Sequence, residues 1–343
     1  MMRILQLTPG TGAFYCGGCL RDAALVRALR RRGHEVLLVP LYMPLVAERE
    51  SEAGEAPIFL SGISVFLSRW VHVPRWLDRV LSAPWLLRVA ARLARFTSAK
   101  DLGESALAML EREPAELERL LEWLRGQQRF DVVCLSNSLL SGLARRLKQE
   151  LGAPVVASLQ GEDTFLDGLL EPYRSRCWER LAERCADVEV LVAPSRFYAE
   201  LMLGRLRLTA EKVVVVHNGI ELDGFEPARE PPRVPTVGFL ARMHYGKGLD
   251  LLAEAFLQAG VSGARLRVAG AMTAADKPLV DALRRKLWGR VEFLPNISRT
   301  EKIAFLQGLS VMSVPTRYAE AFGLYVLEAW ACGVPVVQPR HGA

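Results

Sequence analysis

The sequence lacks the features that would assign it directly to several common classes of protein. Nowhere do about eighteen uncharged apolar residues follow one another, so no segment is predicted to span a membrane. Residues 3–7 run directly into a glycine-rich loop, which is not the pattern of a secretory signal. No sequence signature of a nucleic-acid-binding module is present, which argues against nucleic-acid binding.

Cysteine is scarce and widely spaced. A disulfide framework is therefore not expected, and scattered thiols suit a protein of the reducing cytosol, so we expect a cytoplasmic protein. Two of the cysteines have the Cys-x-x-Cys spacing of a redox or metal pair, but zinc would need a second ligand pair, which the others do not provide. The six residues are Cys16, Cys19, Cys134, Cys177, Cys185 and Cys332.

Length and charge bound the class of protein further. At 343 residues the chain exceeds one ordinary hydrophobic core, so two domains are expected. The charged fraction of 24% is ordinary for a globular protein. The formal charge of +6 comes mostly from arginine, because lysine contributes 7 of the 44 basic residues. A weakly positive charge suits an enzyme that handles phosphorylated substrates.

Alternating strand and helix patterns organise the first part of the chain. Residues 3–7 predict a strand, the helix that begins at Gly17-Gly18 is expected to stop at Gly33, and residues 35–39 predict the next strand. Such a β-α-β start favours a parallel sheet. Further strands are expected at 131–135, 154–159 and 188–192.

A segment rich in proline, glutamate and arginine, without apolar periodicity, interrupts this pattern at residues 222–235 and predicts a linker. It would separate an N-terminal domain, 1–221, from a C-terminal domain, 236–343. Strands are expected in the second domain at 236–240, 265–268, 291–294, 311–314 and 334–338. The predicted fold class is α/β, with two Rossmann-like doubly wound parallel sheets. Because such sheets bind ligands outside the carboxyl ends of their strands, we expect the domains to share one cleft.

Two loops at strand ends are rich in groups that bind phosphate. The glycines from Gly10 to Gly18 would let backbone N–H groups approach a phosphate or sugar at a helix N-terminus, although a tight turn without ligand explains them equally well. After residues 236–240, Arg242 and Lys247 flank a loop that leads into a helix. A guanidinium fork and an ammonium point charge could converge there on a diphosphate, and two solvated surface cations are the alternative.

Two glutamates form the third candidate. On one continuous helix Glu320 and Glu328 would differ by roughly 80° and about 12 Å, too far apart for one small group but suited to opposite ends of a long ligand. Alternatively, Glu320 complements a helix dipole and Glu328 is solvated. The apolar residues that follow Glu328 favour a functional role, because a buried carboxylate without a partner is costly.

A fourth candidate is the polar loop Gln160-Gly161-Glu162-Asp163, which follows residues 154–159 on the expected ligand edge of the first domain. A substrate contact and a plain turn explain it about equally well. Gln160, Glu162 and Asp163 are therefore candidate contacts of an acceptor or sugar.

The order of these motifs resembles retaining glycosyltransferase family 4, whose two facing Rossmann-like domains form the GT-B fold. The resemblance extends over nearly the whole chain, and the Glu-x₇-Glu spacing of the second domain is its specific element. The matching segments are the Gly-Gly loop, His217-Asn218-Gly219-Ile220-Glu221, Arg242 through Lys247-Gly248, Glu320-Ala321-Phe322-Gly323-Leu324 through Glu328-Ala329, and Ala331-Cys332-Gly333-Val334-Pro335-Val336-Val337.

This resemblance implies a catalytic role for three residues. Arg242 and Lys247 would neutralise the donor diphosphate as the leaving group departs, and Glu320 would contact the donor sugar. Glu328 would accept hydrogen bonds from the ribose hydroxyls. The implied partners are a nucleotide-sugar donor and an unidentified glycan, lipid or small-molecule acceptor.

Backbone groups complete the implied donor site. Gly17 and Gly18 would meet the phosphate or sugar from the first domain, and Phe322, Gly323 and Leu324 would offer N–H groups from the second. Members of the family retain the anomeric configuration of the donor and need no metal or other cofactor, which agrees with the absence of an Asp-x-Asp motif here.

The sequence departs from the family at two places. Gln160 stands where many members have histidine, which puts a role of that histidine in doubt. Relatives continue beyond the point that corresponds to Ala343 with further strand–helix units, so the second domain is expected to be incomplete and closure of the cleft is in question.

Alternative functions of different classes stay open. A shortened relative would be a nucleotide-sugar-binding module with little turnover, and an enzyme of the same fold could epimerise or phosphorolyse sugars. A dinucleotide-dependent oxidoreductase is disfavoured because no acidic residue with a ribose role follows the second strand. Residues 66–96 also place three tryptophans among arginines, which predicts either a peripheral membrane contact or a helical lid with solvated arginines.

Overall fold

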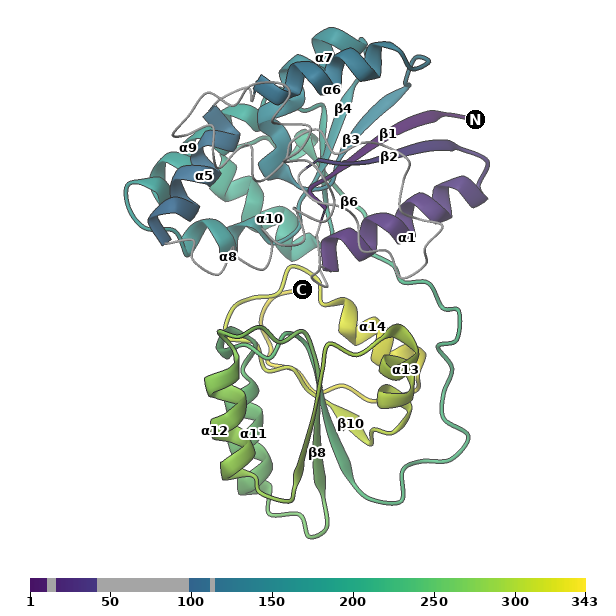
Figure 1. The fold of residues 1–343 in the computed structure, drawn as a ribbon, viewed down its shortest axis with the longest axis vertical. Coiled ribbons are helices and arrows are strands. Elements are labelled where there is room, and N and C mark those ends of the chain that lie inside the picture. The colour runs from purple at the N-terminus through teal and green to yellow at the C-terminus, as the bar shows by residue number, and fades with distance from the viewer. Residues whose placement is uncertain (11–16, 42–98, 112–114) are drawn as a thin grey trace, which may run out of the picture. The chain divides into compact units, whose positions relative to one another are not determined.

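The computed structural model describes residues 1–10, 17–41, 99–111 and 115–343 of the chain. The chain divides into two compact units, Met1–His217 and Asn218–Ala343, each built around its own parallel β-sheet (Figure 1). The predicted α/β fold class is therefore confirmed. The predicted segment 66–96 and Cys16 lie outside the described residues.

The first unit contains a six-stranded parallel sheet in the order β2-β1-β3-β4-β5-β6. Its strands are almost continuously apolar, as expected for a parallel sheet with both faces covered. β1 has β2 on one side and β3 on the other, so the order reverses at β1, and such a point is where doubly wound sheets bind ligands. The strands are β1 (Arg3–Thr8), β2 (Glu35–Pro40), β3 (Val132–Leu135), β4 (Val155–Ser158), β5 (Val190–Ala193) and β6 (Val213–Val215).

Helices connect these strands. Ser195 caps the N-terminus of α10, where its side chain accepts a hydrogen bond from the Tyr198 N–H, and Arg207 caps the C-terminus in the left-handed conformation. The helices are α1 (Gly17–Arg31), α5 (Ala99–Glu111), α6 (Ala115–Arg125), α7 (Ala144–Leu151), α8 (Glu162–Asp167), α9 (Tyr173–Cys185) and α10 (Arg196–Leu206), with short 3-10 turns η3 (Ser138–Leu143) and η4 (Ala210–Lys212).

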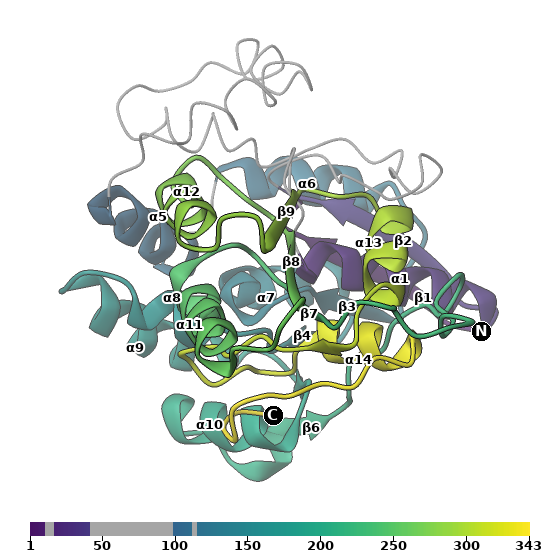
Figure 2. The same cartoon turned by 90° about the horizontal axis from the view of Figure 1, so that it is seen from below.

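The second unit contains a four-stranded parallel sheet in the order β10-β7-β8-β9. β7 is its reversal point, with β8 on one side and β10 on the other. Two helices, α11 and α12, cover one face of the sheet, and α13 and α14 cover the other (Figures 1 and 2). The elements are β7 (Thr236–Leu240), η5 (Tyr245–Lys247), α11 (Leu249–Ala259), β8 (Arg265–Gly270), α12 (Lys277–Lys286), β9 (Val291–Pro295), α13 (Arg299–Gln307), β10 (Val311–Met312) and α14 (Leu324–Ala331).

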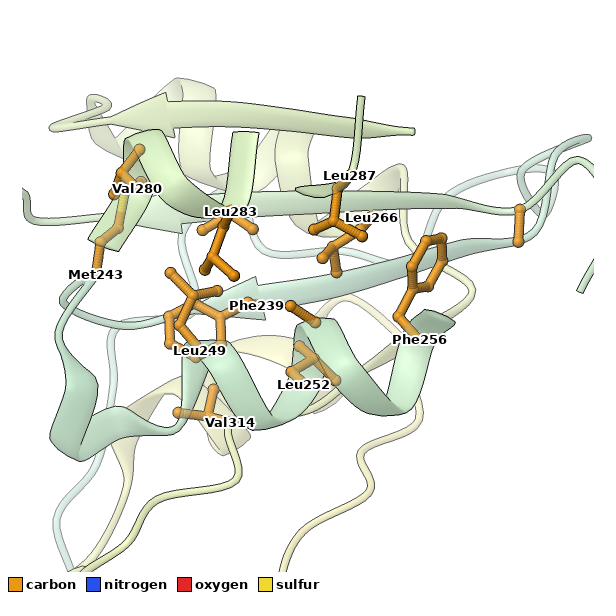
Figure 3. Close-up of a cluster of buried hydrophobic side chains, with 13 residues drawn as sticks. Phe239, Met243, Leu249, Leu252, Phe256, Leu266, Val280, Leu283, Leu287 and Val314 are labelled. Atoms are coloured by element: carbon orange, nitrogen blue, oxygen red, sulfur yellow. The ribbon is translucent and has the colours of Figure 1, made fainter. Parts of the chain in front are cut away.

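A cluster of buried side chains lies between the sheet and the pair α11 and α12, beside the loop 241–248 (Figure 3). Phe239 of β7 is fully buried against Leu249 and Leu252 of α11 and Leu283 of α12. Burial of each such side chain contributes about 1.5–3 kcal/mol. Because Phe239 and Leu249 lie at the two ends of the loop 241–248, their packing fixes where that loop begins and ends.

Strand predictions agree with the structure in most places. Strand β7 has its predicted limits, and β1 through β5, β8 and β9 lie within one or two residues of theirs. Sequence analysis missed β6, although its run of valines is a strand signal. The predicted strand 334–338 is reduced to a single bridge between Val336 and Met312, so that prediction was too long.

The division into units lies close to the predicted linker. The first unit ends at His217, and Phe225 of the predicted linker 222–235 is buried in a core of the second unit with Leu240 and Phe305. The domain limits 1–221 and 236–343 remain a prediction from sequence. None of the described helices has the length and apolar character needed to cross a membrane.

Candidate functional site

The loops that follow β7 and β10 lie together at the reversal point of the second sheet. Lys247, at the end of the β7 loop, forms an ion pair with Glu320 of the β10 loop through its Nζ and the glutamate Oε1. Both were predicted to be catalytic. The side chains are 18% and 19% exposed, so the pair is largely shielded from water while still reachable by a ligand.

Two aromatic rings surround the Lys247 ammonium group. Its Nζ lies 4.9 Å from the centre of the Tyr318 ring and 5.9 Å from that of Tyr325. Burial lowers the pKa of Lys247, but the Glu320 carboxylate and the Tyr318 hydroxyl outweigh this effect and leave that pKa above its usual value. The site therefore keeps a cation at its centre at neutral pH.

Glu320 lies in a loop rather than on a helix. Gly323 adopts a left-handed conformation with φ 84°, and α14 begins after it at Leu324. Glu320 and Glu328 therefore do not share one continuous helix, because Gly323 separates them. The predicted donor-binding residues Phe322, Gly323 and Leu324 thus lie at the N-terminus of α14, where the helix dipole favours an anion.

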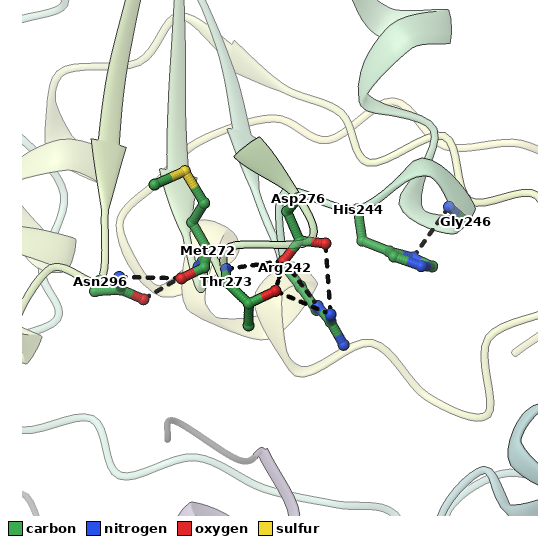
Figure 4. Close-up of polar contacts among 7 residues, drawn as sticks. All are labelled: Arg242, His244, Gly246, Met272, Thr273, Asp276 and Asn296. Carbon is green, nitrogen blue, oxygen red and sulfur yellow. Dashed lines mark hydrogen bonds and ion pairs between the residues drawn. The ribbon is translucent and has the colours of Figure 1, made fainter. Parts of the chain in front are cut away.

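Arg242 lies in the loop after β7. An acidic residue that sequence analysis missed, Asp276, holds its side chain from the segment after β8. Its Nε and Nη2 are 3.3 and 3.4 Å from the carboxylate oxygens of Asp276 (Figure 4). The Asp276 side chain is 3% exposed and accepts further hydrogen bonds from the Thr273 N–H at 2.9 Å and hydroxyl at 2.6 Å. Arg242 itself is 49% exposed, so its guanidinium is oriented and still available to a ligand.

Arg242 and Lys247 act on the same neighbours. Burial raises the pKa of Tyr318, and the Lys247 and Arg242 cations both oppose that shift. Burial lowers the pKa of His244, and the same two cations lower it further. The predicted convergence of the two basic residues on one region is thus consistent with the electrostatics of the second unit.

Glu328, the predicted ribose contact, is paired with a lysine on the neighbouring helix. Lys302 of α13 approaches Glu328 Oε1 to 2.6 Å, and the two side chains are 17% and 16% exposed. The premise of a carboxylate without a partner was therefore wrong: Lys302 compensates the charge. This contact gives Glu328 a structural role beside the predicted one.

A pocket of the first unit lies at the carboxyl ends of β1, β3 and β4, the reversal point of that sheet. It encloses about 220 Å³, and its lining includes predicted residues from two separate motifs, Gly18 with Gln160 and Glu162, together with Asn137 and Phe165. Gly17 and Gly18 begin α1. These residues belong to a different unit from Arg242, Lys247 and Glu320.

Within this pocket Glu162 is a buried anchor. It is 4% exposed and accepts hydrogen bonds from the backbone N–H groups of Ser138 at 2.9 Å and Gln160 at 2.7 Å. The Tyr198 hydroxyl donates to Glu162 at 3.1 Å and lies 2.9 Å from Asp163. Glu162 thus ties the β3 and β4 loops together, and Asp163 is linked to α10 through Tyr198. Of the three predicted acceptor contacts, Glu162 is the buried one, and Gln160 and Asp163 are partly exposed.

Several residues of these sites could not be selected from sequence. Asp276, Tyr318 and Lys302 come from three separate segments, and only their positions beside Arg242, Lys247 and Glu328 identify them. Asp276 at the start of α12 offered a weak signal, since acidic residues favour a helix N-terminus. Within the described part of the chain no group of three His, Cys, Asp or Glu side chains could hold a metal ion.

Comparison with protein families agrees with the two units. A family model described as Glycosyltransferase Family 4 matches residues 104–223, and one described as Glycosyl transferases group 1 matches residues 224–342. The two models together account for most of the chain.

Curated relatives are more similar in sequence but match only in part. A D-inositol 3-phosphate glycosyltransferase of Mycobacterium sp. (strain JLS) is 30% identical over 170 residues, which are 46% of this chain and 38% of the relative. The protein of the same name from Mycolicibacterium paratuberculosis (strain K-10) is 35% identical over 145 residues, 38% of this chain and 32% of the relative. The chain thus matches less than half the length of these relatives.

Solved structures match over the full chain at low identity. The Anabaena protein Alr3699/HepE, solved with UDP and glucose, has a TM-score of 0.64 and 16% identity over 100% of this chain and 82% of its own. Sucrose-phosphate synthase from Thermosynechococcus elongatus has a TM-score of 0.71 and 16% identity, with coverage of 100% and 82%. The two family models and the paired parallel sheets together show that the chain belongs to the family 4 glycosyltransferases of the GT-B fold.

Proposed function

We propose that the protein transfers a sugar from a nucleotide-sugar donor to an acceptor hydroxyl, with retention of the anomeric configuration and without a metal ion. The observation that carries this proposal is the Lys247–Glu320 pair at the reversal point of the second sheet, with Arg242 beside it. It is the region where open α/β sheets bind ligands, and its charges suit a ligand that is anionic at one end and rich in hydroxyls at the other.

The proposed chemistry assigns each charge a task. As the bond between sugar and diphosphate breaks, negative charge grows on the leaving phosphate. Arg242 supplies forked donors and Lys247 a point charge to that phosphate, and such stabilisation of developing charge is a large part of enzymatic rate enhancement. These two cations would do what a metal ion does elsewhere. Glu320 would accept hydrogen bonds from sugar hydroxyls, and the N-terminus of α14 would face the phosphate or sugar.

The nucleoside half of the donor would extend along α14. Glu328 lies one residue before the buried Ala329 and would accept hydrogen bonds from the ribose hydroxyls, sharing its carboxylate with Lys302. The Anabaena protein was solved with UDP and with UDP-glucose, which makes uridine nucleotides the first to test. We place the acceptor in the pocket of the first unit, with Gln160 as its polar contact.

A binding panel tests the donor. Calorimetry with UDP-, GDP- and ADP-glucose, and with the corresponding nucleoside diphosphates, should identify one base that binds at least about tenfold more tightly than the others. Failure of all three to bind would refute the proposed donor site. Binding that persists in the presence of EDTA would support a site without metal, and loss of binding on chelation would oppose it.

Turnover assays separate sugar transfer from the alternative functions. With the donor that binds, a panel of acceptors that includes D-inositol 3-phosphate, after which the curated relatives are named, should yield a product whose anomeric configuration is read by NMR. Retention supports the proposal, and inversion contradicts it. Binding without any turnover favours a binding module, and a donor sugar altered without an acceptor favours an epimerase.

The proposed membrane contact rests on residues 66–96 alone. Co-sedimentation with vesicles of anionic lipid, compared with neutral lipid, tests it. Equal recovery with both kinds of vesicle would remove that proposal.

A further inference from the structure

A second ion pair joins the two loops that supply Lys247 and Glu320. Arg317 of the β10 loop reaches Asp250 in the first turn of α11 through two parallel bonds, Nη1 to Oδ1 at 2.7 Å and Nη2 to Oδ2 at 2.6 Å. The same guanidinium lies 3.7 Å from the centre of the Tyr245 ring and donates to the Tyr245 carbonyl at 2.6 Å. A bidentate, stacked arginine is a geometrically specific link.

The backbones of the two loops also touch. The Arg317 N–H donates to the Gly246 carbonyl at 2.9 Å. A Cβ atom on Gly248 would lie 1.8 Å from the Pro315 carbonyl oxygen, so only glycine permits this approach. The loops are therefore in direct contact, and the position of one determines that of the other.

The two ion pairs are linked along the chain. Arg317 precedes Glu320 by three residues, and Asp250 follows Lys247 by three residues, so each member of one pair is close in sequence to a member of the other. The side chains of Arg317 and Asp250 are 28% and 24% exposed. The hydrogen bonds from Arg317 hold the pKa of the Asp250 carboxyl below its usual value, which marks the contact as favourable to the charged form.

We propose that Arg317 and Asp250 form a positioning pair, which sets the spacing of Lys247 and Glu320 for a donor that touches both. The inference rests on the proposed function, since it assumes that Lys247 meets the diphosphate and Glu320 the sugar. In this proposal Arg317 and Asp250 themselves touch neither the diphosphate nor the sugar. Loosening the link should weaken a donor whose sugar reaches Glu320 more than the nucleoside diphosphate, which meets Lys247 but lacks that sugar.

The variants Arg317→Gln and Asp250→Asn, alone and together, test this by calorimetry with UDP and UDP-glucose, or with the base that the binding panel selects. We expect UDP-glucose to bind about tenfold more weakly in each variant and UDP to change by less than about twofold, since small misplacements of positioning groups have large effects. The double variant should be no weaker than either single one, because both remove one interaction. A matched control is Arg284→Gln. Arg284 of α12 also pairs with an aspartate, Asp281, and also lies over an aromatic ring, Phe293 of β9.

A merely structural pair would give a different pattern. It would lower the melting temperature and leave the ratio of UDP-glucose to UDP affinity unchanged, and that outcome would overturn the inference. Equal weakening of both ligands would overturn it too.

A second readout needs no donor. Lys247 is acylated by an amine-reactive reagent, and the extent of reaction is followed by mass spectrometry. The reaction should be several-fold faster in Arg317→Gln than in the wild type. A Lys247 side chain released from Glu320 is more accessible, and its pKa is no longer raised by that carboxylate. An unchanged rate, as expected for Arg284→Gln, would defeat the positioning role. If the wild-type protein bound no nucleotide, the proposed function would fail, and the labelling rate would still decide the link between the pairs.

Discussion

Lys247 and Glu320, 73 positions apart in the chain, form an ion pair between the loop after β7 and the loop after β10. The contact exists because β10 lies beside β7 in the sheet, so the carboxyl ends of the two strands meet at one edge. Each charge compensates the other in the free protein. In the proposed donor site, a diphosphate and a sugar would meet a cation and a carboxylate that are already oriented.

Replacement of Lys247 by methionine should weaken the nucleoside diphosphate about ten- to a hundredfold, because a charge-assisted hydrogen bond is worth about 1.5–3 kcal/mol. The melting temperature should also fall, since Glu320 then keeps its burial without its cation. Calorimetry and thermal melting measure the two effects. Lys286→Met, which removes an exposed lysine paired with Glu254 on the outer surface, is the control and should change neither. Undiminished nucleotide affinity in Lys247→Met would remove the residue from the site.

The two glutamates should respond differently to replacement by glutamine. Glu320→Gln should leave the bare nucleotide almost unaffected and weaken the nucleotide-sugar and the transfer rate, whereas Glu328→Gln should weaken the bare nucleotide as well. Because Glu328→Gln also leaves Lys302 without its partner, Lys302→Met serves as the control: it should lower stability and keep nucleotide affinity. Equal weakening of the bare nucleotide by both glutamine variants would contradict the division of roles.

Asp276→Asn should weaken nucleotide binding through Arg242. The neutral amide no longer holds the guanidinium, so affinity should fall by less than in Arg242→Ala, by about threefold to tenfold. In the Arg242→Ala background the same substitution should have no further effect on affinity, although its effect on stability persists. A double-mutant cycle by calorimetry measures this coupling, and additive losses would show that Asp276 acts independently of Arg242.

Gly248→Ala should distort the β7 loop and lower stability by more than about 2 kcal/mol. Its backbone has φ +73°, and the added Cβ would collide with the Pro315 carbonyl oxygen. Gly263→Ala is a matched control, since Gly263 has φ +71° with nothing within 4 Å of the added atom. It isolates backbone strain, which should cost about 1 kcal/mol. Equal losses in denaturant titration would show that the loops separate easily.

Acid should release the link between Arg317 and Asp250. The pKa of Asp250 is lowered in the folded protein, chiefly by the hydrogen bonds from Arg317, so its stabilisation is complete above the unfolded value of about 3.9 and is lost as the pH falls through the lower folded value. Asp250→Asn removes this contribution. The difference in melting temperature between wild type and variant should therefore be largest near neutral pH and shrink below about pH 4. A difference that stayed constant down to pH 2.5 would contradict this account.

The local sequence indicated where charged loops follow the strands of the second unit. Arg242 and Lys247 are recognisable because a basic loop follows an apolar strand, and Glu320 because it precedes a glycine and an apolar helix. Strand β7 has its predicted limits because its apolar pattern is local and lies between Pro235 and the loop that leads to Arg242. Prediction failed where the outcome depended on distant contacts. Residues 334–338 have strand-like composition, yet only Val336 pairs, since a strand needs a partner along its whole length.

What the sequence by itself determined is the alternation of strands and helices and the residue types present at each strand end, because these follow from local periodicity and from turn chemistry. What only the tertiary structure decided is which charges meet. Strand order is set by the crossovers and the packing of helices on both faces of the sheet, and no local pattern encodes that β7 lies between β8 and β10. That order brings Glu320 to Lys247 and Asp276 to Arg242. The packing of α13 against α14 likewise places Lys302 beside Glu328. A buried charge is unfavourable without a partner, and tertiary packing determines which partner is close enough to pair with it.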